Sequence, residues 1–349
     1  MAADTRGVFT LKTVRNNILN DEGVPLQDVF TQGPTTLFGA DTGYFGGGAP
    51  GPLTTMDKTT YSTDTTAQVP GDSLTASRNL LTATGDTTAG YFGGGSPGPL
   101  STMDKLTYST DTTAEVPGAA LSLGRYGLAA TGNSTAGYFG GGYIASQAST
   151  VDRIDYSNDT ATASPKGRLS LARYSLAATG NSSYGYFGGG FPGYYSTVDR
   201  IDYSNDTATA SPKGPLSAAN RLLAATGNSS FGYFGGGFNG ANLSLVDRID
   251  YSNDTATASP KGPLSQDRRV LAATGNASFG YFGGGYTSNG VSLVDRIDYT
   301  NDTATAVAKG PLSLARYYFA ATGNSSFGYF GGGNPGPLST VDRIDYSND

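Results

Sequence analysis

Short hydrophobic runs follow one another along the chain in a fixed order, and each run ends at a Gly, Asn, Asp or Pro. Between residues 173 and 216, the first run is 176–181, which consists of small residues and ends in a Gly-Asn turn signal. The second run, 185–190, contains Tyr186 and Phe187 next to each other. Because successive side chains of a strand alternate, the two rings should point to opposite faces of a sheet.

A third run, 196–203, is rich in β-branched residues and is closed by a hairpin turn at 204–207. The polar residues 207–210 then predict a short outer strand, which Pro212 and Gly214 would end. The order predicts four antiparallel strands, with small side chains on the innermost strand and polar side chains on the outermost one.

The pentapeptide Tyr-Phe-Gly-Gly-Gly marks the second run and occurs seven times, at intervals of 47 or 48 residues. A period of about 40 to 50 residues is typical of one four-stranded propeller blade. We therefore predict an all-β fold, a seven-bladed β-propeller over residues 34–349; a β-solenoid is the alternative, but its coils are usually shorter. The aromatic pairs should be structural and buried between blades, at Tyr44, Phe45, Tyr91, Phe92, Tyr138, Phe139, Tyr186, Phe187, Tyr233, Phe234, Tyr281, Phe282, Tyr329 and Phe330.

The two ends of the repeat array do not match. The chain ends just after the third run of the seventh unit, which leaves this unit without an outer strand, and residues 1–33 precede the first unit. Residues 8–14 alternate like a strand. We predict that they complete blade seven, as termini commonly do in propellers; the alternative is that residues 1–33 form an anchor and that the array is cut from a longer one.

The composition removes the commonest catalytic groups, because the chain contains no His, Cys or Trp. It therefore has no thiolate nucleophile, no imidazole base and no Cys/His site for zinc, haem or an iron–sulfur cluster. We expect no enzyme activity, no cofactor and no metal.

Charge and hydropathy limit the partners. A formal net charge of -6 argues against a nucleic-acid partner, which needs a basic surface. Residues 1–19 lack the apolar core of a signal peptide, and no run of about 18 apolar residues is long enough to span a membrane. We expect synthesis in a cytosol and no membrane insertion.

The unit resembles a kelch repeat. Kelch repeats place an aromatic before a Gly-Gly doublet, as in residues 186–189, then an apolar-x-x-apolar-Asp strand, as in 198–202. An Arg leads into the inner strand, as at Arg78, Arg125, Arg173, Arg268 and Arg316. Asn220 replaces one such Arg, and the kelch outer-strand Trp is missing, with Ala161 or Ala208 near its place. The resemblance supports the fold and leaves the function open.

Two longer phrases are similar to those of kelch-like proteins encoded by marine tailed phages, chiefly phages of cyanobacteria. They are Val-Asp-Arg-Ile-Asp-Tyr-Ser-Asn-Asp-Thr-Ala-Thr-Ala and Ala-Ala-Thr-Gly-Asn-Ser-Ser-Phe-Gly-Tyr-Phe-Gly-Gly-Gly. The resemblance implies a virion structural protein associated with the tail or a fibre, with residues 1–33 as closing strand or virion anchor. Its partners would be other virion proteins and a host cell-surface glycan or protein. The alternative is a cell-surface module that binds carbohydrate or protein.

The seven units differ from one another mainly in two connections, the segment after the glycines and the segment that enters each inner strand. In a four-stranded blade both connections lie on one face, while the turns of the other face hardly change. Loops rich in Tyr, Asn, Ser and Gly on a rigid scaffold are typical of recognition surfaces, although free drift of exposed loops would give the same pattern. We expect binding residues at Tyr143, Ile144, Phe191, Tyr194, Tyr195, Phe238, Asn239, Asn242, Tyr286 and Asn289.

Recurring acidic residues predict structure rather than chemistry. The Asn-Asp pairs, such as Asn205-Asp206, lack the Asp-x-Asp-x-Asp spacing of a calcium loop and are interpreted as hairpin turns. Asp199, Arg200 and Asp202 have counterparts in most units, which favours cross-strand or interblade ion pairs over an acid/base pair.

Overall fold

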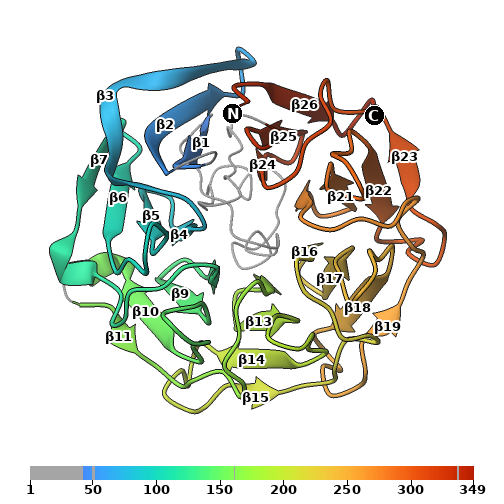
Figure 1. Ribbon diagram of the computed structural model, residues 1–349, viewed down its shortest axis with the longest axis horizontal. Helices are drawn as coiled ribbons and strands as arrows, with labels where there is room; N and C mark the ends of the chain where they lie inside the picture. The colour runs from blue at the N-terminus through green and yellow to red at the C-terminus, as the bar shows by residue number, and fades with distance from the viewer. Residues whose placement is uncertain (1–41, 49–51, 161, 336–337) are drawn as a thin grey trace, which may run out of the picture.

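The strands form seven antiparallel sheets arranged as blades in a ring (Figure 1). The computed structural model describes residues 42–48, 52–160, 162–335 and 338–349. The predicted all-β fold, a seven-bladed β-propeller, is confirmed. Blades two to six have four strands each, and the described parts of the first and last blades have three. Among the described residues, no helix is long and apolar enough to cross a membrane.

The strands of each blade follow one another in chain order. Blades one to three contain β1 (Thr42–Gly46), β2 (Leu53–Thr60), β3 (Thr65–Arg78); β4 (Thr82–Gly85), β5 (Ala89–Gly93), β6 (Met103–Thr107), β7 (Thr112–Glu115); and β8 (Ala129–Gly132), β9 (Ala136–Gly140), β10 (Val151–Asp155), β11 (Ser164–Pro165). Blades four and five contain β12 (Ala177–Gly180), β13 (Tyr184–Gly188), β14 (Val198–Asp202), β15 (Ser211–Pro212); and β16 (Ala224–Gly227), β17 (Phe231–Gly235), β18 (Val246–Asp250), β19 (Ser259–Pro260). Blades six and seven contain β20 (Ala272–Gly275), β21 (Phe279–Gly283), β22 (Val294–Asp298), β23 (Val307–Lys309); and β24 (Ala320–Gly323), β25 (Phe327–Gly331), β26 (Val341–Asp345). Two short 3₁₀ turns are η2 (Pro117–Ala119) and η3 (Tyr156–Asn158).

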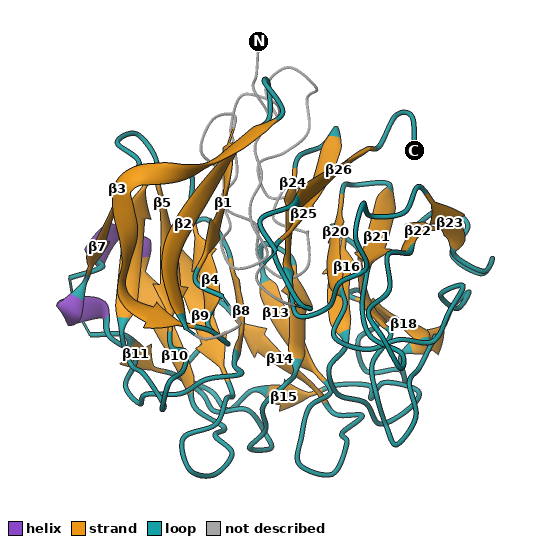
Figure 2. Ribbon diagram, turned by 45° about the horizontal axis from the view of Figure 1, so that its top comes forward, coloured by secondary structure: helices purple, strands orange, loops and turns teal. Residues whose placement is uncertain are grey.

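In blades two to seven the small-residue strand lies innermost, as predicted. Inner strands of neighbouring blades, such as β12 and β16, contact each other around the axis. Both have the sequence Ala-Ala-Thr-Gly and are buried along their whole length. Small side chains let these strands approach closely, and in the tilted view of Figure 2 the strands run between the two faces of the ring, where the loops emerge.

The outer strand of the later blades differs from the prediction. In blade four it is Ser211–Pro212, two residues long, and residues 207–210 form a loop before it. The loop lies against the preceding blade, where the backbone of Ala208 leaves no room for a Cβ on Gly167. Pro212 fits the strand because it lies at the sheet edge, where no ladder hydrogen bond is required of its nitrogen. In blade two the strand β7 does follow the turn directly. Ala161 lies outside the described residues.

The aromatic pairs are buried between blades and point to opposite sides, as predicted. Tyr186 stacks on Tyr251 of the next blade with ring centroids 4.8 Å apart. Its hydroxyl donates to Asp254 Oδ2 at 2.8 Å. Phe187 instead faces the preceding blade, where its ring covers Gly140 so closely that a Cβ there would lie 2.6 Å from a ring carbon. Each blade thus contributes a Tyr to one interface and a Phe to the other.

The interblade carboxylate also binds cations. Asp254 lies 2.8 Å from Arg200 and 3.4 Å from Lys213, so Arg200 makes an interblade ion pair. Equivalent pairs join Lys58–Asp111, Lys105–Asp159, Arg153–Asp206, Arg248–Asp302 and Arg296–Asp349. The Asp side chains of these turns therefore join neighbouring blades through ion pairs.

Blade seven packs against blade one in the same way (Figure 1). The rings of Tyr61 and Tyr329 stack at 5.0 Å, and Arg343 lies 3.2 Å from Asp64. The Tyr61 hydroxyl also lies 2.9 Å from Thr322 Oγ1. These side chains join the two ends of the array. The predicted closing strand at residues 8–14 and the predicted inner strand of the first unit lie outside the described residues.

A buried Arg joins the strands within most blades. The Arg173 guanidinium donates to the Phe187 carbonyl and lies 3.0 Å from Asp199, and both side chains are completely buried. The same pair recurs as Arg125–Asp152, Arg268–Asp295 and Arg316–Asp342, while Arg78, at the end of β3, pairs with Asp104 of blade two. Blade five has Asn220 at this position, and the described residues provide no cation for its buried Asp247. Burial raises the pKa of the Asp247 carboxyl.

Candidate functional site

The two variable connections of each unit meet on one face, as predicted from the four-strand order. In blade four Tyr174 follows the buried Arg173, and Phe191 follows the third glycine. These two residues form an antiparallel bridge: the Tyr174 N–H donates to the Phe191 carbonyl at 3.0 Å, and the Phe191 N–H donates back at 2.8 Å. The same bridge joins Asn79–Ser96, Tyr126–Tyr143, Arg221–Phe238, Arg269–Tyr286 and Tyr317–Asn334. Two backbone hydrogen bonds therefore join the two residues of each pair.

The next residue of each connection belongs to a chain of backbone hydrogen bonds that runs from blade to blade. The Ser175 N–H donates to the Gly127 carbonyl at 2.9 Å, and the Leu222 N–H donates to the Ser175 carbonyl at 3.2 Å. We call the six residues joined in this way the collar: Leu80, Gly127, Ser175, Leu222, Val270 and Tyr318. All six have φ values between 49° and 65°. Non-glycine residues adopt this left-handed region at a cost of about 1–2 kcal/mol each, which the hydrogen bonds of the collar offset.

Relief of this strain is directly testable. Ser175→Gly is expected to raise the free energy of unfolding by about 0.5–1 kcal/mol, because Gly adopts a positive φ without a Cβ penalty and already stands at the equivalent Gly127. Urea unfolding followed by tyrosine fluorescence measures the change. Ser146→Gly is the control, since Ser146 is an exposed loop residue outside the positive-φ set. Equal effects of the two substitutions would contradict strain at the collar.

The side chains of the bridged pairs form a continuous series of ring contacts, which we call the arc. Adjacent members lie between 4.5 and 5.7 Å apart, measured between ring centroids or from a guanidinium carbon to a centroid. The arc consists, in contact order, of Tyr126, Tyr143, Tyr174, Phe191, Arg221, Phe238, Arg269, Tyr286, Tyr317 and Tyr318. It therefore runs across blades three to seven.

The arc is accessible and covers only part of the ring. Its members are half-buried, apart from Tyr318, which is 53% exposed. Blade two carries Asn79 and Ser96 at the bridged positions, so the series of rings stops there. Burial raises the pKa of the Tyr174 phenol, which keeps that group neutral at physiological pH. The surface is thus a fixed, largely apolar strip with two cations near its middle.

Arg221 lies among three rings at the centre of the arc. Its guanidinium carbon is 4.5 Å from the centroid of Phe191, 5.3 Å from Tyr194 and 5.5 Å from Phe238. The Arg269 guanidinium carbon lies 4.6 Å from the Phe238 centroid and 5.0 Å from the Tyr286 centroid. When a guanidinium stacks on an aromatic ring, its N–H groups point outward in the plane of the guanidinium. They can then still donate hydrogen bonds to a ligand.

The arc contains six of the predicted binding residues or contacts them. Tyr143, Phe191, Phe238 and Tyr286 are members, Tyr194 packs on Phe238 at 6.0 Å, and Asn242 Oδ1 accepts a bond from Arg269 at 2.7 Å. The other four are not members of the arc. Asn239 and Asn289 are exposed at loop tips, Ile144 is a half-buried residue that follows Tyr143, and the Tyr195 carbonyl accepts a hydrogen bond from the Asn220 N–H. A binding role of all ten residues stays a prediction.

Sequence reasoning did not select six of the ten arc members as binding residues. Five of them directly follow the buried Arg or Asn of their unit, and the sixth, Tyr318, follows one of these five; the five are Tyr126, Tyr174, Arg221, Arg269 and Tyr317. The available signal was positional: the residue after this Arg or Asn changes between units, and it is aromatic or Arg in five of the six bridged pairs. Only the bridge geometry shows that this position adjoins the residue after the third glycine.

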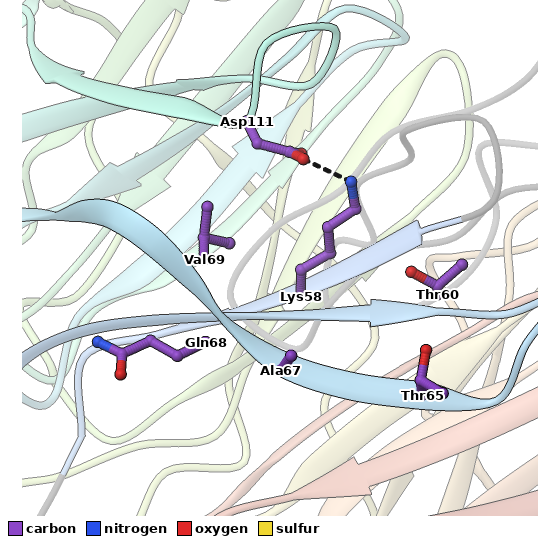
Figure 3. Close-up of a pocket in the computed structure, with 7 residues that line it drawn as sticks. All are labelled: Lys58, Thr60, Thr65, Ala67, Gln68, Val69 and Asp111. Atoms are coloured by element: carbon purple, nitrogen blue, oxygen red, sulfur yellow. Dashed lines mark hydrogen bonds and ion pairs between the residues drawn. The ribbon is translucent and has the colours of Figure 1, made fainter.

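Two cavities among the described residues lie elsewhere, at the outer parts of blades. One, of about 150 Å³, is lined by Thr60, Thr65 and Gln68 and is bounded by the Lys58–Asp111 ion pair at 2.6 Å (Figure 3). The other, of about 190 Å³, adjoins Arg153 and Lys166. Both cavities are lined by cations that form ion pairs between neighbouring blades. We therefore assign them to the structural framework and not to a binding site.

These features define the class of protein: the chain is a seven-bladed β-propeller with an aromatic and arginine surface on one face. No protein-family model matches the sequence, and no curated protein sequence matches it either. Solved structures do match the fold. One, described as "Structure of YjhT", is similar with a TM-score of 0.64 and 14% sequence identity, over 80% of this chain and 98% of that chain. At this identity the likeness shows the fold alone.

Proposed function

We propose that the chain is a non-enzymatic structural protein of a phage virion, associated with the tail or a fibre. In this proposal the propeller scaffolds assembly and recognises the host surface through the arc. The observation that carries the recognition role is the arc itself, in which side chains from five blades form one surface held by backbone bridges. Rigid aromatic side chains bind at a low cost in conformational entropy.

The chemistry of the arc supports binding rather than catalysis. Its side chains are phenols, phenyl rings and guanidinium groups, which keep their protons near neutral pH and so make poor general bases. The acid nearest along the chain, Asp267, is exposed two residues before Arg269. Of the other acids discussed above, Asp254 lies in an ion pair, Asp199 does so as predicted, and Asp247 has no cation among the described residues. No described residue forms the predicted ion pair of Asp202, because its carboxylate accepts hydrogen bonds from the backbone and hydroxyl of Ser204 in the following turn.

The virion role rests on the sequence resemblance to kelch-like phage proteins. Under it, the chain is made in the host cytoplasm and is exposed on the particle, where it contacts other virion proteins. A closed ring suits this setting, and a pair of stacked tyrosines and an ion pair join blade seven to blade one. The runner-up is a cell-surface propeller that binds carbohydrate or protein through the same arc.

Two measurements test the proposal. Mass spectrometry and immunogold electron microscopy of purified particles should find the chain on the tail or its fibres; a chain found only as a free cytosolic protein contradicts the virion role. Fluorescently labelled protein should bind host cells, and Tyr194→Ala should weaken this binding about tenfold, since Tyr194 packs on Phe238 and Arg221. A chain located on the surface of uninfected cells would favour the runner-up.

A further inference from the structure

The composition of the arc points to a class of ligand, and this inference rests on the proposed recognition role. We propose that the arc binds an extended anionic polysaccharide, whose sugar rings stack on the aromatic side chains and whose carboxylate or sulfate groups bind Arg221 and Arg269.

Arg221 has unused hydrogen-bonding capacity. Within the part of the chain that the structure describes, its side chain makes no hydrogen bond or ion pair, and its buried Nε has no partner. The buried arginines of the blades instead ion-pair with an Asp of the same blade, as Arg173 does with Asp199. A guanidinium offers donors in a planar fork that matches the two oxygens of a carboxylate or sulfate. Arg221 is thus preorganised by three rings for an anion that this chain does not supply.

Arg269 provides a second cation on the same strip. It donates one hydrogen bond to Asn242 Oδ1 at 2.7 Å, and its guanidinium carbon lies 4.6 Å from the centroid of Phe238, a ring that Arg221 also contacts. The order along the arc is ring, cation, ring, cation, ring. An acidic polysaccharide presents the matching alternation of apolar sugar faces and anionic groups. The loops after the glycines, 141–150, 189–197, 236–245 and 284–293, contain no acidic residue that would repel it, while the connection into blade six carries the exposed Asp267.

The shape of the surface favours a chain over a small molecule. Small ligands are usually enclosed in pockets, whereas the two cavities described above do not include any arc member. The strip instead continues over five blades. A nucleic acid fits poorly, because one phosphate per nucleotide would face a protein with a net charge of -6 and only two arc cations.

The test uses the full-length protein and polymers that differ in charge. Biolayer interferometry would compare dextran sulfate with dextran, which share a backbone, and would include polygalacturonate as the carboxylated polymer. The variants are Arg221→Gln, Arg269→Gln and, as a matched control, Arg168→Gln, which removes the same charge from an exposed position of another blade connection. Thermal melts confirm that each variant is folded.

We expect binding to dextran sulfate or polygalacturonate and none to dextran, with the preferred polymer identifying the anionic group. Arg221→Gln and Arg269→Gln should each weaken binding about 10- to 100-fold, the effect of losing a charged hydrogen bond, while Arg168→Gln changes it less than about threefold. Equal binding of dextran, or equal losses in all three variants, overturns the proposal. Binding of host cells that depends on Tyr194 but not on either Arg, with no polymer bound, overturns the ligand class and leaves the recognition role intact.

Discussion

Phe187→Ala is expected to lower the free energy of unfolding by about 3–5 kcal/mol, the range measured for truncation of a fully buried aromatic side chain. The Phe187 ring is 0% exposed and lies between blades three and four. It packs with Tyr138, Val151 and Ile201 in one hydrophobic cluster and covers Gly140. Strand backbones surround this space, so neighbouring side chains cannot collapse into it, and the substitution leaves a cavity.

Urea unfolding monitored by circular dichroism would measure this loss. Tyr194→Ala is the control, because Tyr194 is a half-buried loop residue with a positive φ of 56°, and its removal should change stability by less than about 1 kcal/mol. The two variants should therefore have different effects: Phe187→Ala lowers the free energy of unfolding, whereas Tyr194→Ala weakens binding only. A Phe187→Ala protein as stable as the Tyr194→Ala protein would show that the interblade rings do not hold the ring together.

The sequence predicts this fold well because each blade repeats the same local rules. Alternation on the second strand places Tyr186 and Phe187 on opposite faces, and the small residues of 177–180 suit an innermost strand. The outer strand was harder to predict, since residues 207–210 have strand-like composition. These residues form a loop instead of a strand, and the loop backbone packs on Gly167 of the preceding blade. A tertiary contact of this kind cannot be recognised from the local sequence pattern.

The candidate site could be predicted only in outline. Variation among the units indicates the right face and selects the residues after the third glycine, such as Phe191 and Phe238. It does not reveal that Arg221 lies among their rings, because the two connections are separated by about one strand pair in sequence and meet only through the backbone bridge Arg221–Phe238. The predicted loop tips Asn239 and Asn289 vary for a different reason, since they are exposed and unconstrained by the bridge.

Arg173→Asn is expected to lower the free energy of unfolding by about 3–5 kcal/mol, because it leaves the buried Asp199 without its cation. The substitution copies the natural arrangement of blade five, where Asn220 donates from Nδ2 to the Gly236 carbonyl at 2.6 Å and does not pair with Asp247. Arg173→Lys is a useful control: it keeps the charge but loses Nη2, the guanidinium nitrogen that contacts both Asp199 and the Phe187 carbonyl. A loss below about 1 kcal/mol for Arg173→Asn would contradict a stabilising role of the pair.

The reciprocal variant Asn220→Arg should gain stability, by about 1–3 kcal/mol at neutral pH, because it supplies the cation that Asp247 lacks. The pH dependence identifies the cause. Burial raises the pKa of Asp247 in the folded state above its unfolded value of 3.8, so the folded protein binds this proton more tightly than the unfolded chain does. Its contribution to stability is therefore complete below the unfolded pKa and is lost as the pH rises through the folded pKa. The introduced guanidinium stabilises the ionised form of Asp247, so the variant does not lose this stability as the pH rises. The difference in unfolding free energy between Asn220→Arg and the wild type should therefore be small in acid and grow with rising pH. Unfolding free energies measured across this range test the assignment, and a gain that is constant with pH would exclude Asp247 as its source.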